Sequence, residues 1–222
     1  MIYLDNGATS FPKPPQVVRA AGDPFVLDAA QSAGSLPVDF GALGAEFIAM
    51  PGHKGLLGPQ GTGLLLCGDP GKPLLFGGTG TLSREKTMPE DLPERLEAGT
   101  VNVPGAAGLA AGIRLVRGMT PEKIFARGHG QTMACGRALE EMGYRVFTGP
   151  HQAMTLSFQG KADCEEIAEA LGSRGVAVRA GLHCAPLAHE SAGTLEKGTV
   201  RISFGHDASP AQTNALLRAL GV

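Results

Sequence analysis

The sequence predicts an α/β fold in its first half, followed by a compact α+β region. Two short apolar runs, Phe25–Leu27 and Phe47–Met50, are bounded by Gly or Pro and have the length of buried strands. Each run is followed by polar residues, as expected where adjacent parallel strands end at the ligand-binding edge of an open sheet. From Tyr144 onward the pattern changes to strand, helix and strand, which is typical of an α+β domain.

The composition favours a soluble, loop-rich enzyme. The chain has 222 residues, a formal net charge of -2, 33 Gly and 16 Pro, and its charge favours neither nucleic acid nor an anionic membrane as a partner. No apolar run approaches the ~20 residues that span a bilayer, and no signal peptide is recognised. The four cysteines form no CxxC pair, so no zinc site or disulfide framework is indicated. We expect a cytoplasmic protein with reduced thiols.

The remaining elements follow in order. A turn-rich entry leads into a helix over Gln16–Ala21, and an irregular segment over residues 77–96 is of the kind that covers a site. Hydrophobic periodicity predicts the other helices and strands. The helices are Gly105–Arg117, Pro121–Met142, Cys164–Leu171 and Pro210–Leu220, and the strands are Leu64–Cys67, Arg145–Phe147, Thr155–Phe158, Gly175–Arg179 and Thr199–Phe204.

The first candidate site lies at the ends of the two N-terminal strands. Asp28 ends the first, with Gln31 one turn further on, and His53 and Lys54 follow the second before a glycine-rich loop. A lysine amine reacts with an aldehyde cofactor as a Schiff base, and pyridoxal phosphate also needs an acid beside its pyridine nitrogen. Asp28 and Lys54 fit these two roles. Alternatively, Asp28 caps a helix and Lys54 is a solvated loop lysine.

Cys184 is the second candidate centre. It lies in the motif RAGLHCAP, on a loop past a strand, with Arg179 and His183 close in sequence. Such an electropositive, accessible setting favours the thiolate, which is the attacking form. Cys67, Cys135 and Cys164 lie in apolar or helical surroundings, and we interpret them as structural.

Arg201 is a candidate for binding a carboxylate. In the strand that begins at Thr199, it lies on the face opposite Val200 and Ile202. A guanidinium forms bidentate hydrogen bonds with a substrate carboxylate, although a surface salt bridge is the plainer alternative. The remaining histidines show no metal-ligand spacing, so no metal is predicted.

Five motifs follow one another along the chain: DNGATSFPKP, VLDAAQSAG, PGHKGLLGPQGTG, EAGTVNVPG and RAGLHCAP. They resemble the class V aminotransferase family of fold-type I pyridoxal phosphate enzymes, and within it the cysteine desulfurase branch. The resemblance runs from residue 1 to the C-terminus and implies a truncated fold-type I (aspartate aminotransferase-like) large domain plus an α+β C-terminal small domain. The implied parts are an N-terminal segment (1–21), a shortened cofactor domain (22–104) and the small domain with its connecting helix (105–222).

The resemblance implies a role for each candidate cofactor residue. Lys54 carries pyridoxal phosphate, and Asp28 keeps its ring nitrogen protonated. Gln31 bonds the phenolic oxygen and His53 contacts the phosphate. Thr100 reaches the phosphate of the neighbouring subunit's cofactor, which implies a homodimer. A capping threonine is the alternative for Thr100.

The resemblance also implies the reaction. L-cysteine binds with its carboxylate on Arg201, near Arg179, His183 and Asn6, although Asn6 is equally well explained as a turn residue. Cys184 takes up the sulfur as a persulfide, L-alanine leaves, and the sulfur passes to an acceptor protein. Selenocysteine lyase and aminotransferase activity stay open, because one fold serves many reactions.

The resemblance is interrupted after Ala21. Relatives carry here a long block of the cofactor domain, with a phosphate-binding loop and a histidine that stacks on the cofactor ring, whereas this sequence has only the connection Ala21–Pro24. Either this is a deletion or the sequence omits a segment of the molecule. A catalytically inactive domain that folds or binds a partner without turnover is therefore the alternative to the enzyme.

Overall fold

The computed structural model describes residues 25–82 and 84–221. The predicted helix Gln16–Ala21 and the candidate Asn6 lie outside these residues. The chain forms two compact units, Met1–Pro121 and Glu122–Val222. The predicted domain boundaries at residues 21 and 104 stay predictions.

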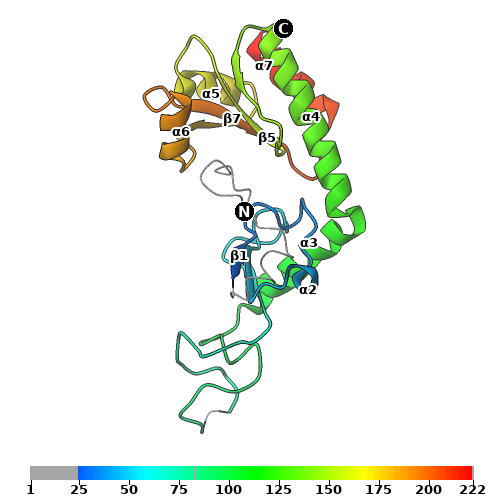
Figure 1. Ribbon diagram of the computed structural model, residues 1–222. Coiled ribbons are helices and arrows are strands. Elements are labelled where there is room, and N and C mark those ends of the chain that lie inside the picture. The colour runs from blue at the N-terminus through cyan, green and yellow to red at the C-terminus, as the bar shows by residue number, and fades with distance from the viewer. Residues whose placement is uncertain (1–24, 83, 222) are drawn as a thin grey trace. The chain divides into compact units, whose positions relative to one another are not determined.

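The first unit, in which Figure 1 labels β1, contains a three-stranded sheet of order β1-β2-β3. Strands β1 (Val26–Asp28) and β2 (Phe47–Pro51) are parallel, as predicted, and β3 (Gly63–Cys67) runs antiparallel to β2. The short helix α2 (Phe40–Leu43) lies between β1 and β2 in the chain. Its first turn is capped by Asp39, whose carboxylate accepts from the Ala42 N–H at 2.9 Å.

One face of this sheet forms the core of the first unit. Leu27, Ile48 and Met50 are buried there and pack with Leu109 of helix α3 (Val103–Met119). Alternation along the strands places Asp28 and Ala49 on the opposite face, together with Leu65, which is 50% exposed. The cofactor candidate Asp28 therefore belongs to the solvent-accessible side of the sheet.

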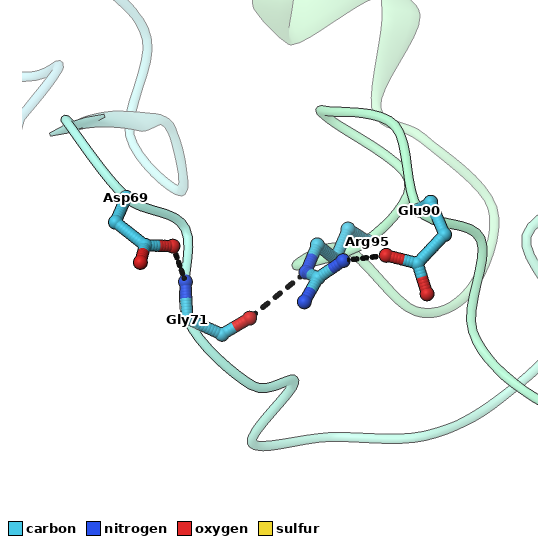
Figure 2. Close-up of polar contacts among 4 residues, drawn as sticks. All are labelled: Asp69, Gly71, Glu90 and Arg95. Atoms are coloured by element: carbon cyan, nitrogen blue, oxygen red, sulfur yellow. Dashed lines mark hydrogen bonds and ion pairs between the residues drawn. The ribbon is translucent and has the colours of Figure 1, made fainter.

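A long segment joins β3 to α3, and its described residues form no helix or strand. Arg95 connects its two ends, as Figure 2 shows: its Nε donates to the Gly71 carbonyl at 2.8 Å, and its guanidinium pairs with Glu90. Asp69 accepts from the Gly71 N–H. Leu74, Leu75 and Phe76 extend from this segment with 91%, 68% and 72% of their surface exposed.

The second unit is an antiparallel sheet of order β4-β5-β7-β6 with helices. Helix α7 lies alongside α4, where the Thr213 hydroxyl bonds the Gln131 amide oxygen at 2.9 Å (Figure 1). The strands are β4 (Arg145–Phe147), β5 (Thr155–Gln159), β6 (Arg179–Gly181) and β7 (Thr199–Ser203). The helices are α4 (Pro121–Glu141), α5 (Cys164–Ser173), α6 (Pro186–Ala192) and α7 (Pro210–Leu220).

The core of the second unit lies on one face of this sheet. Phe158 of β5 and Val200 of β7 are opposite each other and fully buried. Tyr144 meets the Phe158 ring edge-on, with centroids 5.2 Å apart. Cys135 of α4, Leu171 of α5 and Leu216 of α7 complete the same cluster. The other face of β7 is thereby left for Thr199 and Arg201.

One predicted strand is displaced. A strand was expected over Gly175–Arg179, but β6 covers Arg179–Gly181. The residues before it close the C-terminus of α5: the Gly175 N–H bonds the Gly172 carbonyl and the Val176 N–H bonds the Leu171 carbonyl. Gly175 adopts φ 77°, which favours glycine and ends the helix there. Among residues 25–82 and 84–221, no helix is long and apolar enough to cross a membrane.

Candidate functional site

The first group of site residues lies where β1 and β2 end. Asp28 is the last residue of β1, directly opposite Ala49 of β2, and the Ala29 N–H extends the pairing to the Ala49 carbonyl at 2.9 Å. The Asp28 carboxylate accepts from the Ala30 N–H at 2.9 Å, so it caps the turn after β1. Gln31 is exposed in that turn.

His53 and Lys54 lie in a tight loop after β2, which we call the Lys54 loop (Gly52–Gly58). Both side chains are exposed. The loop is closed by its own backbone, since the Gly58 N–H bonds the Gly52 carbonyl at 2.7 Å and the Leu57 N–H bonds the Lys54 carbonyl at 3.0 Å. The exposed side chains of His53 and Lys54 thus extend from a loop whose backbone is closed by two hydrogen bonds.

The Lys54 loop packs against the turn that carries Gln31, through two glycines. A Cβ added to Gly34 would lie 2.0 Å from the Gly55 carbonyl oxygen, and one added to Gly55 would lie 2.2 Å from the Ala33 carbonyl oxygen. Gly34 also has φ 88°. Any larger residue at either position would force the two backbones apart. The glycines therefore bring the segments that carry Gln31 and Lys54 together.

Helix α3 packs against the same loop through a third glycine. A Cβ on Gly112 would lie 2.4 Å from the Leu56 carbonyl oxygen, and Leu56 itself is buried. Within the loop, a Cβ on Gly58 would lie 2.6 Å from a methyl group of Leu109. The Lys54 loop therefore lies between α3 and the turn that carries Gln31 and Gly34, which we call the Gly34 turn.

An open depression of about 470 Å³ lies on the exposed side of the sheet. Asp28 is the one predicted site residue in its lining, together with Glu97 from the long segment and backbone and side chains of β2 and β3. Thr100 is exposed between Glu97 and α3. No hydrogen bond within the described part of the chain joins the Thr100 side chain to the other candidates.

The second group of site residues lies on β6, β7 and the turn after β6. Arg179 and Arg201 are directly opposite each other in the antiparallel ladder, so both project from the same face. The Arg179 Nη2 donates to the Cys184 Sγ at 3.2 Å. Cys184 is exposed, whereas Cys135 and Cys164 are buried and Cys67 is half-buried. The structure thus brings Arg179, Arg201 and Cys184 into one cluster.

His183 completes this cluster. Its Nε2 bonds the Thr199 hydroxyl at 2.9 Å, and its ring lies 5.5 Å from that of His189. Two buried polar atoms have no hydrogen-bond partner among the described residues: His183 Nδ1 and Arg201 Nε. Such orphaned atoms beside a thiol are expected where a polar ligand binds.

The pKa values in this cluster reflect crowding of cations. Burial first, and then the charges of Arg201, His189 and Arg179, together lower the pKa of His183 to about 4, against a hydrogen bond to Thr199 that raises it. Burial, followed by the charge of Arg179, also lowers the pKa of Arg201, whereas Cys184 opposes that shift. At neutral pH His183 is uncharged, so it adds no positive charge beside Cys184, whereas Arg179 and Arg201 do.

Several residues that build these sites were not predicted. They include Thr199, His189 and Thr194 near the turn after β6 that carries Cys184, which we call the Cys184 turn. They also include Gly34 and Gly55 beside Lys54. For Thr199 a signal existed: strand alternation places it two residues before Arg201, on the same face. Within the described ranges, no three His, Cys, Asp or Glu residues gather in a way that would hold a metal ion.

Solved structures define the class of protein. The apo structure of a cysteine desulfurase from Thermococcus onnurineus matches with a TM-score of 0.79 and 31% identity, covering 93% of this chain and 54% of that one. The cysteine desulfurase CsdA from Escherichia coli, in an S-sulfonic acid form, matches with a TM-score of 0.78 and 28% identity, covering 92% and 52%. The predicted fold, a shortened fold-type I pyridoxal phosphate enzyme, is confirmed.

Sequence comparison defines the family. The profile of aminotransferase class-V matches residues 11–216, so the chain belongs to the class V aminotransferase family. A probable cysteine desulfurase from Methanothermobacter thermautotrophicus is 35% identical over 196 residues, which are 81% of this chain and 49% of that protein. The chain spans about half the length of the curated relatives it matches. The predicted family and branch are therefore confirmed.

Pyridoxal phosphate is the cofactor of this family, and the chain's donor set fits it. Asp28 offers a carboxylate for a pyridinium nitrogen, Gln31 an amide for the phenolic oxygen and Lys54 an amine for the aldehyde. His53 adds a donor for phosphate. The glycine contacts described above bring the loops that carry Gln31 and Lys54 together, which is what a shared ligand requires.

Replacing Gly34 with alanine tests the packing of the Lys54 loop. We expect Gly34→Ala to lower the free energy of local opening over residues 27–57 by about 3 kcal/mol, because the new Cβ meets a backbone oxygen and the backbone φ is positive. Amide hydrogen exchange read by mass spectrometry measures this change.

Gly61→Ala is the matched control, since Gly61 has φ 75° but nothing within 4 Å of an added Cβ. It should lower the same free energy by only about 1–2 kcal/mol, the cost of the backbone conformation. Equal effects of the two substitutions would show that the contact between Gly34 and Gly55 is unimportant.

The lowered pKa of His183 predicts a pH dependence of stability. Unfolded His183 binds a proton below about pH 6.5, whereas folded His183 binds one only below about pH 4. The unfolded state therefore holds more protons between these values, and the stability of the second unit should fall as pH falls from about 6.5 to about 4. Urea unfolding followed by hydrogen exchange in β6 and β7 measures this slope.

His183→Asn should reduce that slope, because the titrating group is gone. His151→Asn replaces an exposed histidine of the same unit and serves as the control. The assignment fails if both substitutions change the pH dependence by the same amount.

Proposed function

We propose that this chain is a pyridoxal phosphate-dependent cysteine desulfurase-like enzyme that converts L-cysteine to L-alanine and leaves a persulfide on Cys184. The supporting observation is the cluster of the second unit, in which an exposed thiol accepts from Arg179 while a second arginine stands opposite the first. The names of its relatives point to the same reaction.

The paired arginines support an anionic substrate. Two guanidinium groups directly opposite each other in a sheet repel, and no acidic side chain of the described residues forms a salt bridge with either. An anion that accepts from both removes this repulsion. The proposal therefore gives Arg201, with its unpartnered Nε, the task of binding the substrate carboxylate.

Each remaining residue is assigned one task. Bound pyridoxal phosphate supplies an electron sink for the bonds at the substrate Cα. Asp28 holds a proton on the ring nitrogen, Gln31 and His53 bind cofactor oxygens, and the Lys54 Nζ accepts the proton of the substrate Cα. Thr100 binds phosphate across a homodimer, and the exposed apolar group Leu74–Phe76 supports such association.

The sulfur step involves only two sulfur atoms and one carbon. The Cys184 thiolate forms a bond to the substrate sulfur, and the Cβ–S bond breaks with its electron pair left on the substrate carbon. That carbon takes up a proton, the Lys54 Nζ returns a proton to Cα, and the product leaves as L-alanine, while Cys184 keeps one extra sulfur atom. Exposure of Cys184 supports onward transfer to an acceptor protein. The free cysteines support the proposed cytoplasmic location, where thiols stay reduced.

A second candidate is a domain that no longer turns over substrate. It is favoured by the openness of the depression at Asp28, because cofactor sites normally enclose most of their ligand. Under this proposal the chain folds or binds a partner but releases no alanine.

The test is production of alanine from L-cysteine by the full chain supplied with pyridoxal phosphate. We expect L-alanine to appear together with a Cys184 peptide heavier by one sulfur atom, and Cys184→Ala to abolish both because the sulfur has no acceptor. Cys67→Ala is the matched control and should retain both.

Three results would overturn the proposal in different ways. No alanine in any variant would favour the inactive domain. Keto acid formation that survives Cys184→Ala would favour an aminotransferase. Turnover of selenocysteine without turnover of cysteine would favour a selenocysteine lyase.

A further inference from the structure

Several buried polar side chains of the second unit lie near the Cys184 turn. Among its described residues the buried polar set is Thr132, His189, Thr194, Thr199 and Thr213. Three of these lie on α6, on β7 or between them, next to the turn. Burying a polar group costs free energy unless it is hydrogen-bonded, so such a concentration indicates a specific task.

These side chains form hydrogen-bonded pairs. The Thr199 hydroxyl bonds His183 Nε2 at 2.9 Å, and the Thr194 hydroxyl bonds His189 Nδ1 at 2.8 Å. The rings of His183 and His189 lie 5.5 Å apart with a tilt of 48°. Of these two hydrogen bonds, the one from Thr199 reaches the Cys184 turn, because His183 directly precedes Cys184 in the chain.

The turn itself is conformationally strained. His183 and Cys184 adopt φ 54° and 61°, a left-handed conformation that non-glycine residues rarely adopt and that costs about 1–2 kcal/mol for each residue. Within the turn, the Ala185 N–H bonds the Leu182 carbonyl at 2.8 Å. One such bond does not offset the strain of two residues, so the turn depends on contacts from outside.

We propose that Thr199 is a positioning residue for Cys184: its hydroxyl anchors the His183 ring to β7 and so holds the left-handed turn in the conformation in which Arg179 reaches the Cys184 sulfur. Strand register supports this, since Thr199 lies opposite Gly181, where β6 ends and the turn begins.

The inference rests on the proposed function only in taking Cys184 as the reactive thiol. It concerns how the protein presents that thiol, which can be read without cofactor or substrate. A chain that fails to release alanine would therefore leave this test intact.

The test is the rate at which iodoacetamide alkylates Cys184 in the folded chain, measured over a pH series by peptide mass spectrometry. In Thr199→Val the hydroxyl is lost at nearly constant volume. We expect the rate at neutral pH to fall roughly tenfold and the rate profile to move to higher pH, because the thiolate loses a charged donor. Thr199→Ser keeps the hydroxyl and should restore both.

Thr132→Val is the matched control. Thr132 is also fully buried in the second unit and makes a single hydroxyl bond, to the Gly128 carbonyl at 2.9 Å on α4. It should lower stability without moving the alkylation profile. An unchanged profile in Thr199→Val, or an equal change in Thr132→Val, would overturn the proposal.

A second variant covers the case in which Thr199→Val does not fold. His183→Asn keeps a residue that tolerates positive φ but is too short to reach Thr199. It should slow alkylation of Cys184 as Thr199→Val does. A wild-type rate in a folded His183→Asn protein would contradict the anchoring role.

Discussion

The cofactor half of this chain depends on contacts that only glycine permits. The Lys54 loop lies between the Gly34 turn and helix α3, with backbone atoms so close that a single Cβ would lie within 2.4 Å of a carbonyl oxygen at Gly34, Gly55 or Gly112. This close packing determines where the backbone of the Lys54 loop lies relative to its two neighbours. The exposed Lys54 side chain therefore extends from a backbone whose position is set by packing. A residue that binds a small ligand requires such a backbone.

A different constraint organises the second half. One face of its sheet is apolar and covered by helices, so alternation sends Thr199 and Arg201 to the other face. The register then sets Arg179 opposite Arg201 and leaves Gly181 opposite Thr199. Burial and the charge of Arg179 lower the pKa of Arg201, and burial and the charges of both arginines lower the pKa of His183, so that it is neutral at pH 7. The same sheet thus builds a stable core on one side and a cationic surface beside a thiol on the other.

The sequence predicted what local pattern determines and missed what tertiary contact determines. Short apolar runs that end in Asp28 and Lys54 predicted the parallel pair, and alternation predicted the face of Arg201. The start of β6 was missed because Gly175 and its neighbours close helix α5, which strand periodicity does not encode. The neutrality of His183 was also missed, because it arises first from burial, which is a tertiary effect, and then from charged neighbours that include Arg201 on another strand. The close approach of Gly34 to Gly55 was missed because it joins two turns that are 21 positions apart in the chain.

The central claim is that this chain, at about half the length of its relatives, keeps a pyridoxal phosphate site at Lys54. Borohydride reduction of the chain with pyridoxal phosphate, followed by peptide mapping, tests it most directly. The account predicts a pyridoxyl group on Lys54 and none on the exposed Lys72 or Lys197. Equal labelling of all three lysines, or labelling of none, would contradict it.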